Sequence, residues 1–224
     1  MASSNRKPRI GDDIRFGFEV ECVISGEKWE SFVKRIIKLE QSADCRIQIS
    51  DDGSIRRELE GRPASYYMSV ELKISPLLTT PSMKLLKRVF AIVRRYGGTN
   101  ETCGLHVNVS SSNRKKMCNF DPIKFAQNSL WNDILRTFQR TANSYCKSTV
   151  IDKPASKMQF YKSLSNSFLD RYSNINYTNF PGDTINDRTR VEIRGLGNKN
   201  YEQKYDVIAP IVRQIKKVFN TACD

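Results

Sequence analysis

Acidic residues and the only histidine of the chain occupy alternating positions in four short segments. In RFGFEVECV, Glu19 and Glu21 alternate with apolar residues, and in CGLHVNVS, His106 does the same. The segments YMSVELKIS and RVEIRG add Glu71 and Glu192 in the same alternation. Because side chains alternate between two faces along a β-strand, each segment would have one apolar face and one face with a carboxylate or an imidazole.

Four carboxylates and one imidazole on the same face of a sheet would suit divalent cations. Carboxylates at close range raise one another's pKa and cost free energy at low dielectric constant, and a divalent cation compensates for this. Oxygen ligands with one imidazole favour Mg²⁺ or Mn²⁺ over structural zinc. Arg190 and Arg194 flank Glu192 and could neutralise a phosphoryl group. The alternative is a half-solvated sheet with surface salt bridges, and we favour the site because four segments share the pattern.

Helical segments alternate with these strands. Apolar residues recur at the spacing of one helical face, and the expected helices cover residues 27–41, 81–96, 121–146, 157–168 and 202–222. The third of these could be broken, and the fourth is short. Pro210 is expected to kink the last helix or to mark a late start.

The composition predicts one globular domain. A chain of 224 residues is long enough for one sizeable core, and it contains no apolar run of the ~20 residues that cross a bilayer. The polar, basic start has no apolar segment typical of a signal peptide, so we expect a cytoplasmic protein with a flexible basic tail over 1–12 and a single domain over 13–224. The six cysteines form no CxxC pair, which favours reduced thiols over disulfides or zinc.

The net charge of +13 points to phosphate-bearing partners. Such an excess of Lys and Arg attracts polyanions and raises encounter rates with them, although it also serves solubility alone. The basic clusters lie at 84–95, 114–116 and 216–217. They favour, as one alternative, a protein that binds nucleic acid or an acidic partner without catalysis.

Six segments resemble, in order and in approximate separation, motifs of the amidoligase family, a group related to glutamine synthetase and glutamate-cysteine ligase. They are FGFEVE, DDGSI, VELKISP, CGLHVNV, DRYSNIN and RVEIRG, and they span about residues 15–200. The resemblance implies an α+β fold like the glutamine synthetase catalytic domain, with an antiparallel sheet that has a concave active-site face and is backed by helices. It also implies an ATP-dependent ligase: a carboxylate attacks the γ-phosphate of ATP, and an amine then displaces phosphate from the acyl phosphate to form an amide.

The resemblance also assigns metal ligands. Glu19, His106 and Glu192 would hold one Mg²⁺ or Mn²⁺ ion that bridges the ATP phosphates. Glu21 and Glu71 would hold a second ion near the substrate carboxylate. The resemblance names no base for the ammonium group of the amine.

Four further residues are expected to contact ATP or the transferred phosphoryl group. Arg194 would stabilise the transferred group, Arg171 is a second candidate for this role, and Arg190 and Asn108 would contact the nucleotide together with Arg194. Many relatives have a second histidine where this chain has Asn108. They also have an apolar pair where it has Lys73-Ile74, and the added charge on the site face favours an anionic substrate.

Two further functional hypotheses are compatible with the same residues, besides the ligase hypothesis. A kinase on a related fold would leave a phosphorylated acceptor instead of an amide. A basic exterior could also recruit a nucleic acid or another phosphate-bearing molecule as one of the ligase substrates, so that catalysis and polyanion binding are combined.

Overall fold

The structure is a computed structural model of the chain that describes residues 13–59, 61–141, 146, 173–180, 185–186 and 188–224. The tail expected over 1–12, the short helix expected near 157–168 and Arg171 lie outside the described residues.

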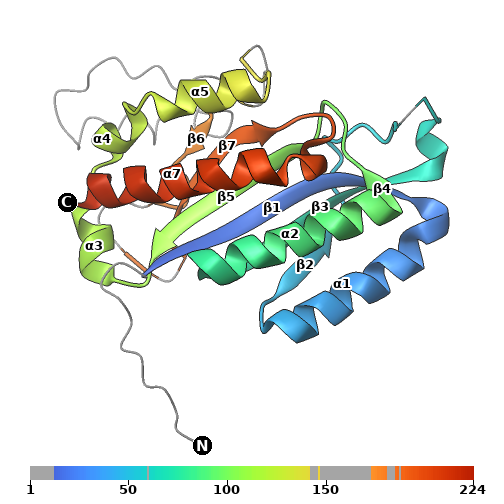
Figure 1. Cartoon of the computed structure of the whole chain (residues 1–224), viewed down its shortest axis with the longest axis horizontal. Helices are drawn as coiled ribbons and strands as arrows, with labels where there is room; N and C mark the ends of the chain where they lie inside the picture. Colours follow the sequence, from blue (N-terminus) through green and yellow to red (C-terminus); the bar gives the residue numbers. More distant parts are fainter. Residues whose placement is uncertain (1–12, 60, 142–145, 147–172, 181–184, 187) are drawn as a thin grey trace, which may run out of the picture.

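A seven-stranded antiparallel sheet runs through the molecule (Figure 1). Its strands follow the order β2-β3-β1-β5-β7-β6, and β4 pairs with β1 beyond the end of β5. The strands are β1 (Ile14–Ser25), β2 (Ile47–Ser50), β3 (Tyr67–Leu78), β4 (Gly97–Gly98), β5 (Gly104–Ser111), β6 (Ile175–Asn176) and β7 (Val191–Gly197). The predicted α+β class, an antiparallel sheet backed by helices, is confirmed.

Three long helices lie side by side along one face of this sheet (Figure 1). They are α1 (Trp29–Ala43), α2 (Thr79–Tyr96) and α7 (Tyr205–Cys223). Each was expected from its apolar stripe. Pro210 lies inside α7, which begins at Tyr205, so of the two alternatives for this proline the late start is wrong. The proline removes one backbone donor within the helix.

After β5, the described residues form three short helices: α3 (Arg114–Asn119), α4 (Pro122–Ala126) and α5 (Leu130–Thr137). The break expected in the third helical segment is confirmed, because α4 and α5 are separate. Asp121 caps α4 by accepting hydrogen bonds from the backbone N–H groups of Ile123 and Lys124.

The hydrophobic core fills the space between the sheet and the helices. Alternate residues of β1, such as Phe16, Phe18 and Val20, are fully buried there, together with Phe90 of α2 and Phe219 of α7. Burial of each such side chain contributes about 1.5–3 kcal/mol. No described helix has both the length and the apolar character that crossing a membrane requires.

Two irregularities in the strands shape the other face of the sheet. In β3, Ser75 and Pro76 together lie opposite Gly17, and in β7, Arg194 and Gly195 lie opposite the single residue at position 106. These β-bulges bend a strand and re-aim its side chains. The backbone approaches closely at Gly17, where a Cβ atom would lie 2.9 Å from the carbonyl oxygen of Ile74.

Candidate functional site

The polar face of the sheet, opposite α1, α2 and α7, gathers carboxylates from β3, β1 and β7 around one histidine of β5, the strand between β1 and β7. In the strand register, Glu19 of β1 lies between Lys73 of β3 and His106 of β5. Two residues further along β1, Glu21 pairs with Glu71 of β3. Antiparallel pairing thus brings together residues that are far apart in the sequence, as the alternation predicted.

The first group of possible ligands consists of Glu19, His106 and Glu192. The Nδ1 atom of His106 lies 3.2 Å from Oε2 of Glu19 and 3.3 Å from Oε1 of Glu192. One ligand atom from each of the three residues lies within 4.8 Å of the other two. Two oxygen donors and one nitrogen donor at these separations fit one divalent cation.

The second group consists of Glu21, Glu71 and the same histidine. The Nε2 atom of His106 lies 3.3 Å from Oε1 of Glu21, and the ligand atoms of this group also lie within 4.8 Å of one another. The backbone N–H of Gly104 donates to Oε2 of Glu21 at 2.5 Å. Lys73, whose charge on this face was expected, places Nζ 2.8 Å from Oε2 of Glu71.

His106 faces the acids, as predicted, but it is as buried as a core residue, with 5% of its surface exposed. Burial lowers the pKa of the imidazole, but the charge of Glu21 and of the other two carboxylates beside the ring outweighs burial and raises the pKa above its ordinary value of 6.5. The centre of the polar face therefore favours a positive charge.

The carboxylates differ in their pKa because the balance between burial and hydrogen-bond or charge partners differs among them. Burial favours a higher pKa for Glu19, yet hydrogen bonds with His106 and Asn108 and the charge of the ring lower it to about 2. Burial raises the pKa of Glu192, with a further contribution from the charge of Glu19. Burial also raises the pKa of Glu71, although its contact with Lys73 acts in the opposite direction.

A second layer of hydrogen bonds orients the first group. Asn108 donates from Nδ2 to Oε1 of Glu19 at 3.0 Å and accepts at Oδ1 from Nε of Arg190 at 2.9 Å. Such partners fix the orientation of metal-binding side chains. Asn108 and Arg190, both expected to contact the nucleotide, are thus joined to each other and to the carboxylate of Glu19.

Glu192 is held in a similar way from two sides. Nε of Arg194 lies 3.3 Å from Oε1 of Glu192, and Nδ2 of Asn176 donates to Oε2 at 3.0 Å. The sequence reasoning missed Asn176, although it lies in the segment DRYSNIN and pairs with Glu192 in the register of β6 and β7. Arg171 of the same segment is outside the described residues.

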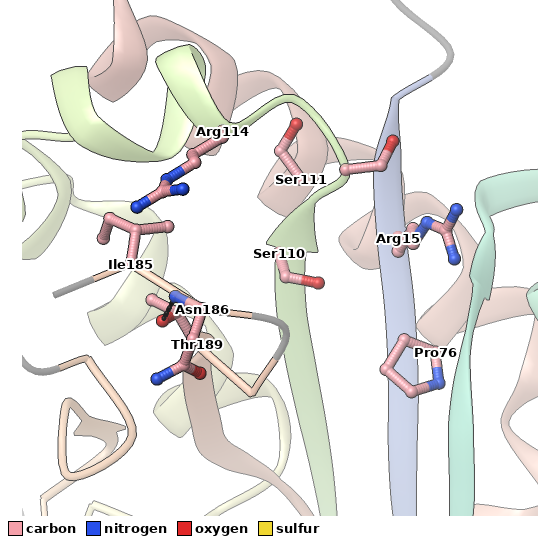
Figure 2. A pocket seen from close by; sticks show the side chains of 9 residues that line it. Arg15, Pro76, Ser110, Ser111, Arg114, Ile185, Asn186 and Thr189 are labelled. Atoms are coloured by element: carbon pink, nitrogen blue, oxygen red, sulfur yellow. Dashed lines mark hydrogen bonds between the residues drawn. The ribbon is translucent and has the colours of Figure 1, made fainter.

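A pocket of about 530 Å³ lies at the end of β5 that follows Asn108, and its lining includes Ser110, Ser111 and Ser112. Figure 2 shows Ser110 on its strand between Arg114 on one side and Arg15 on the other. Its lining residues are Arg15, Pro76, Ser110, Ser111, Ser112, Arg114, Ile185, Asn186 and Thr189. Two arginines and several hydroxyls without a lining carboxylate favour an anion. Arg15 and Arg114 were not predicted as site residues, although Arg15 alternates with Gly17 and Glu19 on the same face.

No protein-family model matches the sequence, and no curated protein matches it significantly. The motifs and the geometry of the polar face are therefore the features that point to a function.

Proposed function

We propose that the protein is an ATP- and metal-dependent carboxylate-amine ligase of the amidoligase type, with a fold of the glutamine synthetase catalytic-domain kind. The observation that carries this proposal is the convergence of four carboxylates on one buried histidine, in two groups whose ligand atoms lie within 4.8 Å. A cluster of this charge on a structural surface would cost free energy without a counter-ion. The residues of this cluster come from neighbouring strands of one sheet, which favours a function to which each of them contributes.

The donor set fits a hard divalent cation. Glu19, His106 and Glu192 would hold Mg²⁺ or Mn²⁺. When bound, this ion would supply charge neutralisation for the phosphates of ATP, since phosphoryl transfer depends on positioning and on electrostatic stabilisation. The protein contributes the fixed orientation of the carboxylates through Asn108 and Asn176.

The pocket beyond Asn108 is the best place for the nucleotide. Its lining residue Arg15 lies four residues from Glu19 on β1, or about 13 Å away at the rise of an extended strand. Arg15 and Arg114 would attract phosphate oxygens. Arg190 and Arg194 lie nearer to the acids and would neutralise the transferred phosphoryl group.

The substrate carboxylate and the amine would bind at the opposite end of the polar face. Glu21 lies six residues beyond Arg15 on β1, or about 20 Å away at the rise of an extended strand. Between these positions, the carboxylate would attack the γ-phosphate, and the amine would then displace phosphate from the acyl phosphate. The burial of Glu21 and His106 would help to keep water from this intermediate.

A mass-spectrometric condensation screen tests the proposal. The protein is incubated with ATP, Mg²⁺ and a pool of amino acids, peptides, polyamines and nucleotides, with heavy oxygen in the carboxylates. We expect ADP, phosphate that carries one heavy oxygen, and a product with the mass of two reactants less one water. A phosphorylated acceptor without an amide would instead indicate a kinase, and no ATP turnover with any pool would contradict both enzymatic functions.

A second function, nucleic-acid binding, is favoured by the outer surface of α2. This helix carries five exposed cations and no acid: Lys84, Lys87, Arg88, Arg94 and Arg95. Among the described residues, none of the five forms an ion pair with a carboxylate. The helix lies between α1 and α7, on the far side of the sheet from the acids (Figure 1). This surface would bind phosphates independently of the carboxylate site.

Binding of a single-stranded RNA oligomer at several salt concentrations tests the second function. Replacement of Lys84 and Lys87 by Gln should weaken binding and reduce the slope against log salt by about 1 for each phosphate contact that is lost. The matched control replaces Lys124 and Lys199, which lie elsewhere on the surface, and should leave binding unchanged. Equal effects of the two double variants would contradict a specific role for α2.

A further inference from the structure

The two carboxylate groups share His106 through different ring nitrogens. Nδ1 faces Glu19 and Glu192 at 3.2 and 3.3 Å, whereas Nε2 faces Glu21 at 3.3 Å. A neutral imidazole has one nitrogen that can ligate a cation and one N–H that donates a hydrogen bond. Metal-binding histidines commonly donate this N–H to a carboxylate. An ion held at Nδ1 would therefore leave Nε2–H to donate to Glu21, and the second group would lose its nitrogen ligand.

The carboxylates of the second group already have partners within the protein. Nζ of Lys73 lies 2.8 Å from Oε2 of Glu71, and the Ser50 hydroxyl donates to the same oxygen at 3.3 Å. The backbone N–H of Gly104 donates a hydrogen bond to Oε2 of Glu21. The Glu71 side chain is 12% exposed and the Lys73 side chain is 47% exposed, so the ammonium group pairs with a carboxylate that is largely shielded from water.

The formal charges of the polar face also favour a single ion. Its four carboxylates together carry four negative charges. One divalent cation, Lys73 and Arg194 would balance them, since each of these two side chains contacts one of the carboxylates. A second divalent cation would leave the cluster with two excess positive charges in a buried environment, which is unfavourable.

We propose that Lys73 takes the place of a second divalent cation, so that the site binds one metal ion, held by Glu19, His106 and Glu192. This inference rests on the proposed function, because it specifies which ions that site binds. It departs from the two-ion arrangement that the family resemblance implies. In the ligase reaction, the ammonium group of Lys73 would neutralise the negative charge of the substrate carboxylate. It would do so at the end of the polar face near Glu21 and Glu71, where the second ion was expected.

The number of bound Mn²⁺ ions for each chain tests this inference. Calorimetry and equilibrium dialysis should give one ion for the native chain and two for Lys73→Met, which removes the charge but keeps a flexible side chain. Lys73→Arg keeps the charge and should bind one ion. Lys124→Met removes an exposed lysine elsewhere and should also bind one. Electron paramagnetic resonance provides a second readout, because two neighbouring Mn²⁺ ions in Lys73→Met should show spin coupling.

Two carboxylate variants keep the test decisive even if Lys73→Met does not fold. Glu192→Gln removes a ligand of the single ion and should lower the Mn²⁺ affinity by more than the roughly 10–100-fold that loss of an outer hydrogen-bond partner costs. Glu71→Gln removes only the partner of Lys73 and should lower the affinity less than about tenfold. The opposite ranking of these two variants would place the ion in the second group and overturn the inference.

The possible negative results distinguish the proposed role of Lys73 from the proposed ligase function. Two ions for the native chain, or one ion for a folded Lys73→Met, would overturn the role of Lys73 and leave the ligase proposal standing. No bound Mn²⁺ in the native chain at millimolar concentration would contradict the proposed metal site itself, and the role of Lys73 with it.

Discussion

The two faces of the sheet consist of alternate residues of the same strands, and both are largely buried at the centre. Phe18 is fully buried against the helices, and its neighbour in the next strand across the sheet, Val107, is fully buried as well. On the opposite face, His106 is only 5% exposed. The faces differ in their contacts: apolar side chains surround Phe18, whereas three carboxylates lie within 3.3 Å of the imidazole of His106. Burial alone therefore does not separate a core residue from a site residue.

A substitution on the apolar face should produce the largest loss of stability. Phe18→Ala removes a fully buried ring and should lower the free energy of unfolding by about 3–5 kcal/mol, because it leaves a cavity and loses apolar burial. Urea denaturation measures this loss. Mn²⁺ affinity of the remaining folded protein should stay within about threefold of the native value, since Phe18 points away from the ligands. A loss of stability below about 1 kcal/mol would contradict the assignment of this face to the core.

A substitution on the polar face should reverse this pattern. Glu192→Gln should lower the Mn²⁺ affinity by more than the roughly 10–100-fold that loss of an outer hydrogen-bond partner costs, because a neutral amide is a poorer ligand than a carboxylate. The stability of the metal-free protein should change less than in Phe18→Ala. Glu27→Gln, on an exposed residue before α1, is the matched control. If both glutamine variants bind Mn²⁺ equally well, Glu192 is not a ligand.

The second layer of the site should show a smaller effect. Asn176→Ala removes the donor to Oε2 of Glu192 without removing a ligand, and we expect a loss of Mn²⁺ affinity of about tenfold. Asn119→Ala changes an exposed residue at the end of α3 and serves as the control. Calorimetric titration compares the two, and an unchanged affinity in Asn176→Ala would show that this hydrogen bond does not orient the ligand.

The pH dependence of stability should show the smallest effect. The pKa of His106 is raised above 6.5 in the folded, metal-free protein, so its ion pairs contribute stability that is complete below pH 6.5 and is lost as the pH rises through the raised pKa. Thermal unfolding in the presence of a chelator should follow this decline. In His106→Gln the decline should be absent. A melting temperature of the native protein that rises over the same range would contradict the ion pairs on the polar face.

The alternation on the two faces could be predicted because it is a local property of each strand. The segments around Glu19, Glu71, His106 and Glu192 each show it within a few residues, and the structure places them on one face as expected. The roles of these residues as ligands stay predictions. The amphipathic helices α1, α2 and α7 could be predicted for the same local reason, since each has a continuous apolar stripe.

Features that depend on pairing between distant segments could not be predicted. Asn176 lies in a strand of two residues, which is too short to show alternation, and only the register with β7 brings it to Glu192. The contact of Lys73 with Glu71 needs a side-chain conformation that no spacing fixes. The pocket at Arg15 and Arg114 combines β1 with segments about 100 and 170 residues further along the chain. Helix α3 was missed because Arg114–Asn119 is short and mostly polar.

The central claim is that the polar face binds ATP through a divalent cation, and calorimetric titration with ATP tests it most directly. The native chain should bind ATP with measurable heat in the presence of Mg²⁺ or Mn²⁺ and should lose this heat when a chelator removes the metal. Glu19→Gln should lose metal-dependent binding although it remains folded. No heat from the native chain, or the same heat with and without metal, would contradict the claim.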